Sequence, residues 1–133
     1  MSAKKRIVVV EDETALLTVL IEWLKTEGYE AFGAPTGQEG IALIKQHLPD
    51  LILLDIILPG KNGFEVMKEL SLDEATAKIP IVILTNLGDQ QERQTALSLG
   101  AKGYLVKAEN DFPSINKMIK SVLSRSQNKN HAF

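Results

Sequence analysis

Leu51-Ile52-Leu53-Leu54-Asp55 is a continuous apolar run that ends on a carboxylate. An uninterrupted apolar run of this length is typical of a strand that is buried on both faces, as in a parallel sheet covered by helices. Three further runs, residues 7–10, 81–84 and 103–106, have the same character. A weaker run, residues 30–33, precedes Pro35 and is therefore expected at the edge of the sheet.

Amphipathic segments lie between these apolar runs. Their apolar residues recur at helical spacing, which predicts helices near residues 16–24, 36–48, 64–72, 89–100 and 115–123. Thr36 and Glu39 have the spacing of a capping box at the start of the second helix, and Asp89 is a candidate cap for the fourth. Gly28 and Gly100 are placed to end the first and fourth helices.

Five strand-helix units in succession predict one α/β domain. Such units form parallel strands joined by right-handed crossovers, and an open doubly wound sheet is the natural architecture for five of them. A closed eight-stranded barrel needs a much longer chain. We expect the domain to occupy residues 1–125 and to be followed by a polar C-terminal tail, residues 126–133.

The composition narrows the class of protein. The chain has 133 residues, a formal net charge of -2 and no cysteine. The charge gives no reason to expect nucleic-acid binding, and the lack of cysteine excludes disulfides and thiolate chemistry. No apolar run approaches the roughly 20 residues of a membrane span. We therefore expect a cytoplasmic protein without a membrane segment.

Reactive or ionic side chains follow four of the five predicted strands. Glu11 and Asp12 come after the first strand, Asp55 after the third, Thr85 after the fourth and Lys107 after the fifth. The carboxyl ends of parallel strands share one edge of the sheet, and ligands of open α/β sheets bind at that edge. These five side chains are therefore expected to form one site.

Three carboxylates at one edge predict a metal ion. Two unit charges about 4 Å apart interact by roughly 4 kcal/mol at an effective dielectric constant of 20, so one lysine cannot offset the cluster. Mg²⁺ suits carboxylate and water oxygens best. Asp12 and Asp55 are the expected direct ligands, and Glu11 is expected to act through water. The backbone carbonyl of Ile57, before the turn at Pro59, is a further candidate.

The same residue types support phosphoryl transfer. A carboxylate can act as the nucleophile and form an aspartyl phosphate, while a metal ion neutralises charge on the transferred group. Asp55 is the best candidate nucleophile because it stands alone at the end of the most apolar strand. Lys107 and the Thr85 hydroxyl could each contact a phosphate oxygen.

Each of these residues also has a purely structural explanation. Asp12 could cap the first helix, Asp55 could begin a turn, Lys107 could be a solvated lysine, and Tyr104 could be a half-buried strand aromatic. Such explanations would have to apply independently at every strand end on one edge. The presence of reactive or ionic side chains at four strand ends of one edge favours a shared chemical role instead.

The chain resembles the receiver domain of two-component response regulators, in particular the chemotaxis-regulator type. The resemblance runs from about residue 6 to residue 123 and rests on Glu11-Asp12, Asp55, Pro59-Gly60, Gly63, Thr85, Ala101-Lys102-Gly103-Tyr104 and Lys107, in this order. It implies the flavodoxin-like (βα)5 fold with strand order 2-1-3-4-5.

The resemblance also implies a function in a phosphorelay. Asp55 would accept a phosphoryl group from a sensor histidine kinase or a phosphotransfer protein, with Mg²⁺ required, and would later lose it by hydrolysis. The domain would catalyse only its own phosphorylation and dephosphorylation. Thr85 would move toward the phosphoryl group and Tyr104 would turn inward. The face of the fourth helix, fifth strand and fifth helix would then bind a downstream partner. The resemblance also allows a homodimer.

Three positions depart from the family pattern, and the first of them, Glu11 in place of the commoner Asp, is a tolerated variation. Ala108 stands where the family usually has a proline after a cis peptide, and a cis bond before a non-proline residue costs about 3 kcal/mol. The geometry of the Lys107–Ala108 peptide is therefore left open. Ile57, two residues after the acceptor, offers no polar side chain to position water, so we expect slow loss of the phosphoryl group.

Three other functions compete with the receiver. A phosphohydrolase of the haloacid-dehalogenase type needs a second Asp two residues after the nucleophile, where this chain has Ile57. An FMN binder needs a phosphate loop after the first strand, where Glu11-Asp12-Glu13 would repel phosphate. A receiver-shaped interaction module that is never phosphorylated stays open, because Ala108 departs from the pattern.

Overall fold

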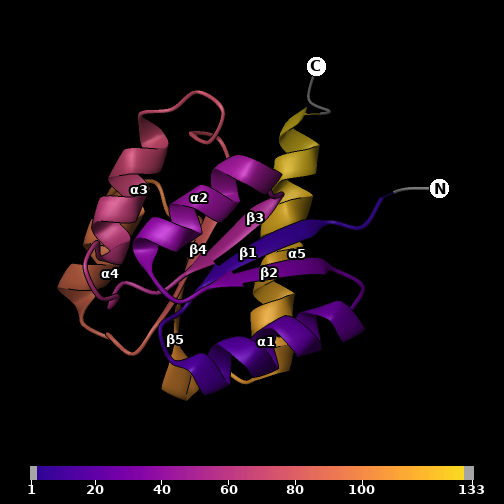
Figure 1. The fold of residues 1–133 in the computed structure, drawn as a ribbon, viewed down its shortest axis with the longest axis horizontal. Helices are drawn as coiled ribbons and strands as arrows, with labels where there is room; N and C mark the ends of the chain where they lie inside the picture. Colours follow the sequence, from indigo (N-terminus) through magenta and orange to yellow (C-terminus); the bar gives the residue numbers. More distant parts are fainter. Residues whose placement is uncertain (1–2, 131–133) are drawn as a thin grey trace.

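The computed structural model describes residues 3–130, with side chains described through residue 126. Five parallel strands form one sheet in the order β2-β1-β3-β4-β5 (Figure 1). The strands are β1 Arg6–Val10, β2 Glu30–Ala34, β3 Leu51–Leu54, β4 Ile81–Thr85 and β5 Gly103–Val106. The helices are α1 Thr14–Thr26, α2 Gly37–His47, α3 Gly63–Ser71, α4 Gln90–Ser98 and α5 Phe112–Asn130, with a short 3-10 helix, η1, at Lys107–Glu109.

The predicted fold class and strand order are confirmed. The central strand β3 is buried along its whole length, which explains why its sequence shows no polar alternation. β2 lies at one edge of the sheet, as the weak apolar run before Pro35 predicted. Within residues 3–130, no helix is both long and apolar enough to cross a membrane.

The sheet divides the core into two layers. Ile7 and Val9 of β1 face the layer that α1 and α5 cover, whereas Val8 and Val10 face α2, α3 and α4. Figure 1 shows α1 and α5 on one side of the sheet and the other three helices on the opposite side. Alternate side chains of each inner strand therefore pack into different layers. Because both faces of the strand are buried, both need apolar side chains.

The helix ends follow the predicted signals in part. Thr36 accepts a hydrogen bond from the Glu39 amide at 3.1 Å, but the Glu39 carboxylate accepts from the Thr36 hydroxyl instead of the Thr36 amide. The predicted capping box is therefore only half formed. A complete box opens α3, where Asn62 and Glu65 each bond the other's backbone amide at 3.0 Å.

Two further helix predictions have different outcomes. Asp89 occupies the N-cap position of α4, but its side chain makes no cap hydrogen bond within the described part of the chain. Gly100 has a φ of 105°, a left-handed conformation that favours glycine, and it follows the end of α4 as predicted. α5 continues through Asn130 and so includes residues 126–130 of the predicted tail. Residues 131–133 lie outside the described part.

Strand register brings the predicted site residues to one edge of the sheet. Val10 of β1 pairs with Leu54 of β3, so Glu11 and Asp55 follow at the same level on neighbouring strands. The Asp55 amide donates to the Val10 carbonyl at 3.0 Å and extends the ladder by one step. Thr85 pairs with Val106, so Lys107 begins immediately beyond the end of β4.

Gly63 allows α3 to begin directly against the end of β3. Its amide donates to the Ile56 carbonyl at 2.8 Å. A Cβ atom at position 63 would lie 2.4 Å from the Asp55 carbonyl oxygen and 2.7 Å from the Ile56 Cα. Both are backbone atoms, so the overlap could be relieved only by moving the loop that holds Asp55.

We therefore expect Gly63→Ala to lower the free energy of unfolding by about 1–3 kcal/mol, as overpacking against fixed backbone does. Chemical denaturation of the purified chain would measure the change. Gly88→Ala is the matched control, because a Cβ there would meet only the Val106 side chain at an ordinary 3.7 Å. Equal stability of the two variants would contradict the close packing at Gly63.

Candidate functional site

Glu11 and Asp55 place two buried carboxylates side by side at the edge of the sheet. Glu11 is 1% exposed and Asp55 is 4% exposed. One Glu11 oxygen accepts a hydrogen bond from the Glu13 amide at 2.9 Å, and one Asp55 oxygen accepts from the Ile57 amide at 3.1 Å. Burial raises the pKa of the Glu11 carboxyl above its ordinary value, although its hydrogen bond to Lys107 opposes the rise.

Lys107 joins three carboxylates through one ammonium group. Its Nζ atom lies 2.7 Å from Glu11 Oε1, 2.8 Å from Glu13 Oε1 and 2.8 Å from Asp55 Oδ2. Burial alone would lower the pKa of Lys107, but the hydrogen bonds to Asp55, Glu11 and Glu13 together raise it. Lys107 is therefore a fixed positive charge at neutral pH.

The loop after β5 aims Lys107 correctly without a proline. Every peptide bond in the described residues is trans, including the bond before Ala108. Lys107 begins the short helix η1, and Asn110 closes the turn by donating from its side chain to the Val106 carbonyl at 2.9 Å. The Lys107–Ala108 peptide, whose geometry the sequence left open, is therefore trans, and Lys107 still reaches Asp55.

The carboxylates at this edge could hold a metal ion. Glu11, Asp12 and Asp55 each offer an oxygen, and these oxygens lie within 4.8 Å of one another. Asp12 is exposed, so the cluster opens to solvent on one side. Three carboxylates, including that of Glu13, contact the Lys107 ammonium and Asp12 adds a fourth to the cluster, so three formal negative charges remain. A divalent cation would offset most of this charge, so the residues present fit such an ion.

Thr85 and Tyr104 converge on one loop residue, Leu87. Thr85 is fully buried at the end of β4, and its hydroxyl oxygen accepts from the Leu87 amide at a long 3.4 Å. The Tyr104 hydroxyl donates to the Leu87 carbonyl at 2.5 Å, and its ring is 6% exposed. The Arg93 guanidinium of α4 lies 4.8 Å from the ring centroid.

Tyr104 is buried against α4. The hydrogen bond to Leu87 and the cation–π contact with Arg93 hold it there. The inward turn of Tyr104 on switching stays a prediction.

Sequence reasoning overlooked Glu13 as a part of the site. Its side chain is half-exposed, yet it supplies one of the three contacts to Lys107. The only available signal was its position in the acidic run after β1, where a solvated acid at the start of α1 looks the same. The backbone carbonyl of Ile57 stays a prediction, since the contact seen there involves its amide.

A comparison with family models identifies the response regulator receiver domain over residues 7–122. The chain is 34% identical to Protein PilH of Pseudomonas aeruginosa over 119 residues, which cover 90% of this chain and 98% of PilH. It is 37% identical to the phosphate regulon transcriptional regulatory protein PhoB of Rhizobium meliloti over 92% of this chain, but spans only 53% of that regulator.

Solved structures agree with the sequence relatives. A CheY-like receiver domain protein from Methanospirillum hungatei superimposes with a TM-score of 0.88 at 28% identity, covering 96% of this chain and 99% of that one. The BeF3-activated receiver domain of Klebsiella pneumoniae RstA gives 0.81 at 30% identity, covering 89% and 97%. The family model covers most of this chain and PilH matches it nearly end to end, so the chain belongs to the response regulator receiver domain family of two-component systems.

Proposed function

We propose that this receiver domain accepts a phosphoryl group on Asp55 from a sensor histidine kinase or a phosphotransfer protein. The observation that carries the proposal is the 2.8 Å contact between Lys107 and Asp55 at the mouth of an acidic cluster. A buried carboxylate beside a fixed ammonium is suited to receive an anionic group, because after the transfer the ammonium can contact the negatively charged phosphoryl oxygens.

The transfer step needs only groups at this edge of the sheet. One Asp55 carboxylate oxygen attacks phosphorus, and the bond between phosphorus and the donor imidazole nitrogen breaks with its electron pair on that nitrogen. Lys107 contacts the transferred oxygens, and the Thr85 hydroxyl donates to another. Asp12, Asp55, Glu11 through water and the Ile57 carbonyl would hold Mg²⁺. When bound, Mg²⁺ supplies neutralisation of the charge on the transferred group.

The proposed switch begins at Leu87. Thr85 and Tyr104 both hydrogen-bond this residue, so a shift of the Thr85 hydroxyl toward a phosphoryl oxygen would disturb the loop that anchors Tyr104. Tyr104 in turn lies under Arg93 of α4. A local charge change could thereby alter the α4-β5-α5 face, where we place the downstream partner or a second copy of the chain.

The proposal assigns no activity toward other substrates. Catalysis is confined to the domain's own phosphorylation and dephosphorylation, in the cytoplasm, where ATP-dependent kinases supply phosphoryl groups. A half-exposed apolar Ile57 stands where a haloacid-dehalogenase enzyme would need its general acid. This residue favours a phosphoacceptor over a phosphohydrolase.

Incubation with acetyl phosphate and Mg²⁺ is expected to add one phosphoryl mass to the intact chain. Asp55→Asn should abolish the adduct, because an amide is not a competent nucleophile, and omission of Mg²⁺ should abolish it as well. Intact-protein mass spectrometry measures all three. Asp12→Asn should reduce the yield, whereas Glu109→Gln, which removes an exposed acid just beyond Lys107, should leave it unchanged.

Two results would contradict the phosphoacceptor function. An adduct that persists in Asp55→Asn would assign the phosphoryl group to another residue. Absence of any adduct, from acetyl phosphate and from a phosphorylated phosphotransfer protein alike, would favour a receiver-shaped interaction module that is never phosphorylated.

The phosphorylated form is expected to lose its phosphoryl group slowly. Ile57 is 50% exposed beside Asp55 and has no polar atom in its side chain to orient an attacking water. After removal of the donor, intact mass followed over time would give the lifetime. Ile57→Asn should shorten it severalfold, while Leu72→Asn, at an 87% exposed apolar position just after the C-terminal end of α3, should not. Loss within seconds in the unaltered chain would oppose this account.

A further inference from the structure

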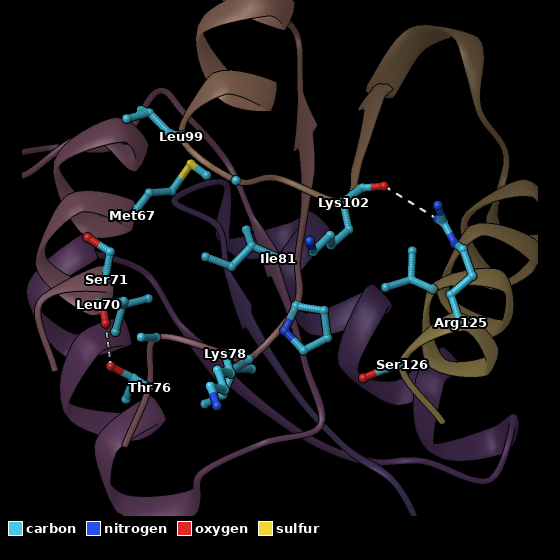
Figure 2. A pocket seen from close by; sticks show the side chains of 15 residues that line it. Met67, Leu70, Ser71, Thr76, Lys78, Ile81, Leu99, Lys102, Arg125 and Ser126 are labelled. Atoms are coloured by element: carbon cyan, nitrogen blue, oxygen red, sulfur yellow. Dashed lines mark hydrogen bonds between the residues drawn. The ribbon is translucent and has the colours of Figure 1, made fainter. Parts of the chain in front are cut away.

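A cavity lies beyond the opposite ends of the strands from Asp55. It has a volume of about 770 Å³ and opens beside Ile81, the first residue of β4, whereas Asp55 and Thr85 stand at the other strand ends. Figure 2 shows Leu70 and Ser71 of α3 on one side of this basal cavity, Arg125 of α5 on the other and Ile81 between them. Small-molecule sites typically enclose 300–1,000 Å³.

The charged side chains of the basal cavity are all positive. Lys78, Lys102 and Arg125 line it, and no aspartate or glutamate does so within the described part of the chain. The whole chain has 17 acidic and 15 basic residues, so this local excess of positive charge is not a reflection of composition. Arg125 reaches from α5 toward the segment before β5, and its Nη2 atom lies 3.5 Å from the Lys102 carbonyl oxygen (Figure 2).

The floor of the basal cavity is apolar. Met67 and Leu70 of α3 are almost fully buried behind it, and Ile79 and Leu99 are partly buried at its margins. The one buried hydroxyl in the wall, Thr76, donates to the Leu70 carbonyl at 2.7 Å and so leaves no polar group unsatisfied there. A bound ligand would contact apolar side chains at the floor of the cavity and cationic side chains at its rim.

We propose that the basal cavity binds a small amphipathic carboxylate, that is, an organic acid with an apolar body and one anionic end. The apolar body would displace water from the floor, and the carboxylate would lie among Lys78, Lys102 and Arg125, where the guanidinium can donate two parallel hydrogen bonds. The site is separate from the phosphoryl site, and it stands whether or not Asp55 is phosphorylated.

Titration of the ¹⁵N-labelled full chain with decanoate, below its micelle concentration, tests this proposal. Amide shifts measured by NMR should saturate and should concentrate at Ser71, Ala77 and Lys102, which line the cavity. Decyltrimethylammonium has the same apolar tail and the opposite charge, so it should produce no saturable shift at these amides. Decyl phosphate should bind no better than decanoate if the carboxylate is the preferred anion.

Three variants separate the cavity from general surface charge. Ser71→Phe fills the cavity from an exposed position on α3 and should abolish saturable binding, with an unchanged melting temperature showing that the fold is intact. Arg125→Gln removes one rim cation and should weaken binding roughly two- to fivefold, as expected for a partly exposed ion pair. Lys120→Gln removes an exposed α5 cation outside the cavity and should leave the affinity unchanged.

The proposal is overturned if decanoate gives no saturable shift, if decyltrimethylammonium binds as well, or if folded Ser71→Phe retains full affinity. Shifts at the same amides with a glutamate-rich peptide, but not with decanoate, would assign the basal cavity to a protein partner and would equally overturn it.

Discussion

The ammonium group of Lys107 offsets part of the repulsion among four carboxylates that lie at one edge of the sheet. It contacts Glu11, Glu13 and Asp55 within 2.8 Å, while Asp12 lies beside them in the acidic cluster. Without such a cation, each carboxylate pair about 4 Å apart would repel by roughly 4 kcal/mol at an effective dielectric constant of 20. The site thus keeps an excess of negative charge that a further cation could offset.

The rest of the fold serves to keep this arrangement at one edge. Parallel pairing of β1 with β3 and of β4 with β5 carries Glu11, Asp55 and Lys107 to the same level. The close approach of Gly63 fixes the loop after Asp55, and Leu87 links Thr85 to Tyr104. A charge placed on Asp55 would therefore act on packed elements with few alternative positions, which is how a local event can change a distant face.

Much of this could be predicted from the sequence because strand runs and their terminal residues obey strong rules. A buried parallel strand is continuously apolar, and its carboxyl end must lie at the ligand edge, so Asp55 and Lys107 were accessible from sequence alone. The Lys107–Glu13 contact could not be predicted from the sequence, because it depends on the side-chain conformation of a half-exposed glutamate. The contact between Tyr104 and Arg93 was not accessible either, because the two residues lie on different elements. The basal cavity is likewise a product of packing between segments far apart in the chain.

The central claim is that Asp55 receives a phosphoryl group that Lys107 then contacts. The most direct measurement is a crystal structure of the chain with Mg²⁺ and beryllofluoride, a mimic of the phosphoryl group. The account predicts one beryllofluoride on an Asp55 oxygen, a contact from Lys107 Nζ to a fluorine and Mg²⁺ at Asp12. Binding of the mimic elsewhere, or an Asp55 that stays unmodified with Lys107 still on its three carboxylates, would contradict it.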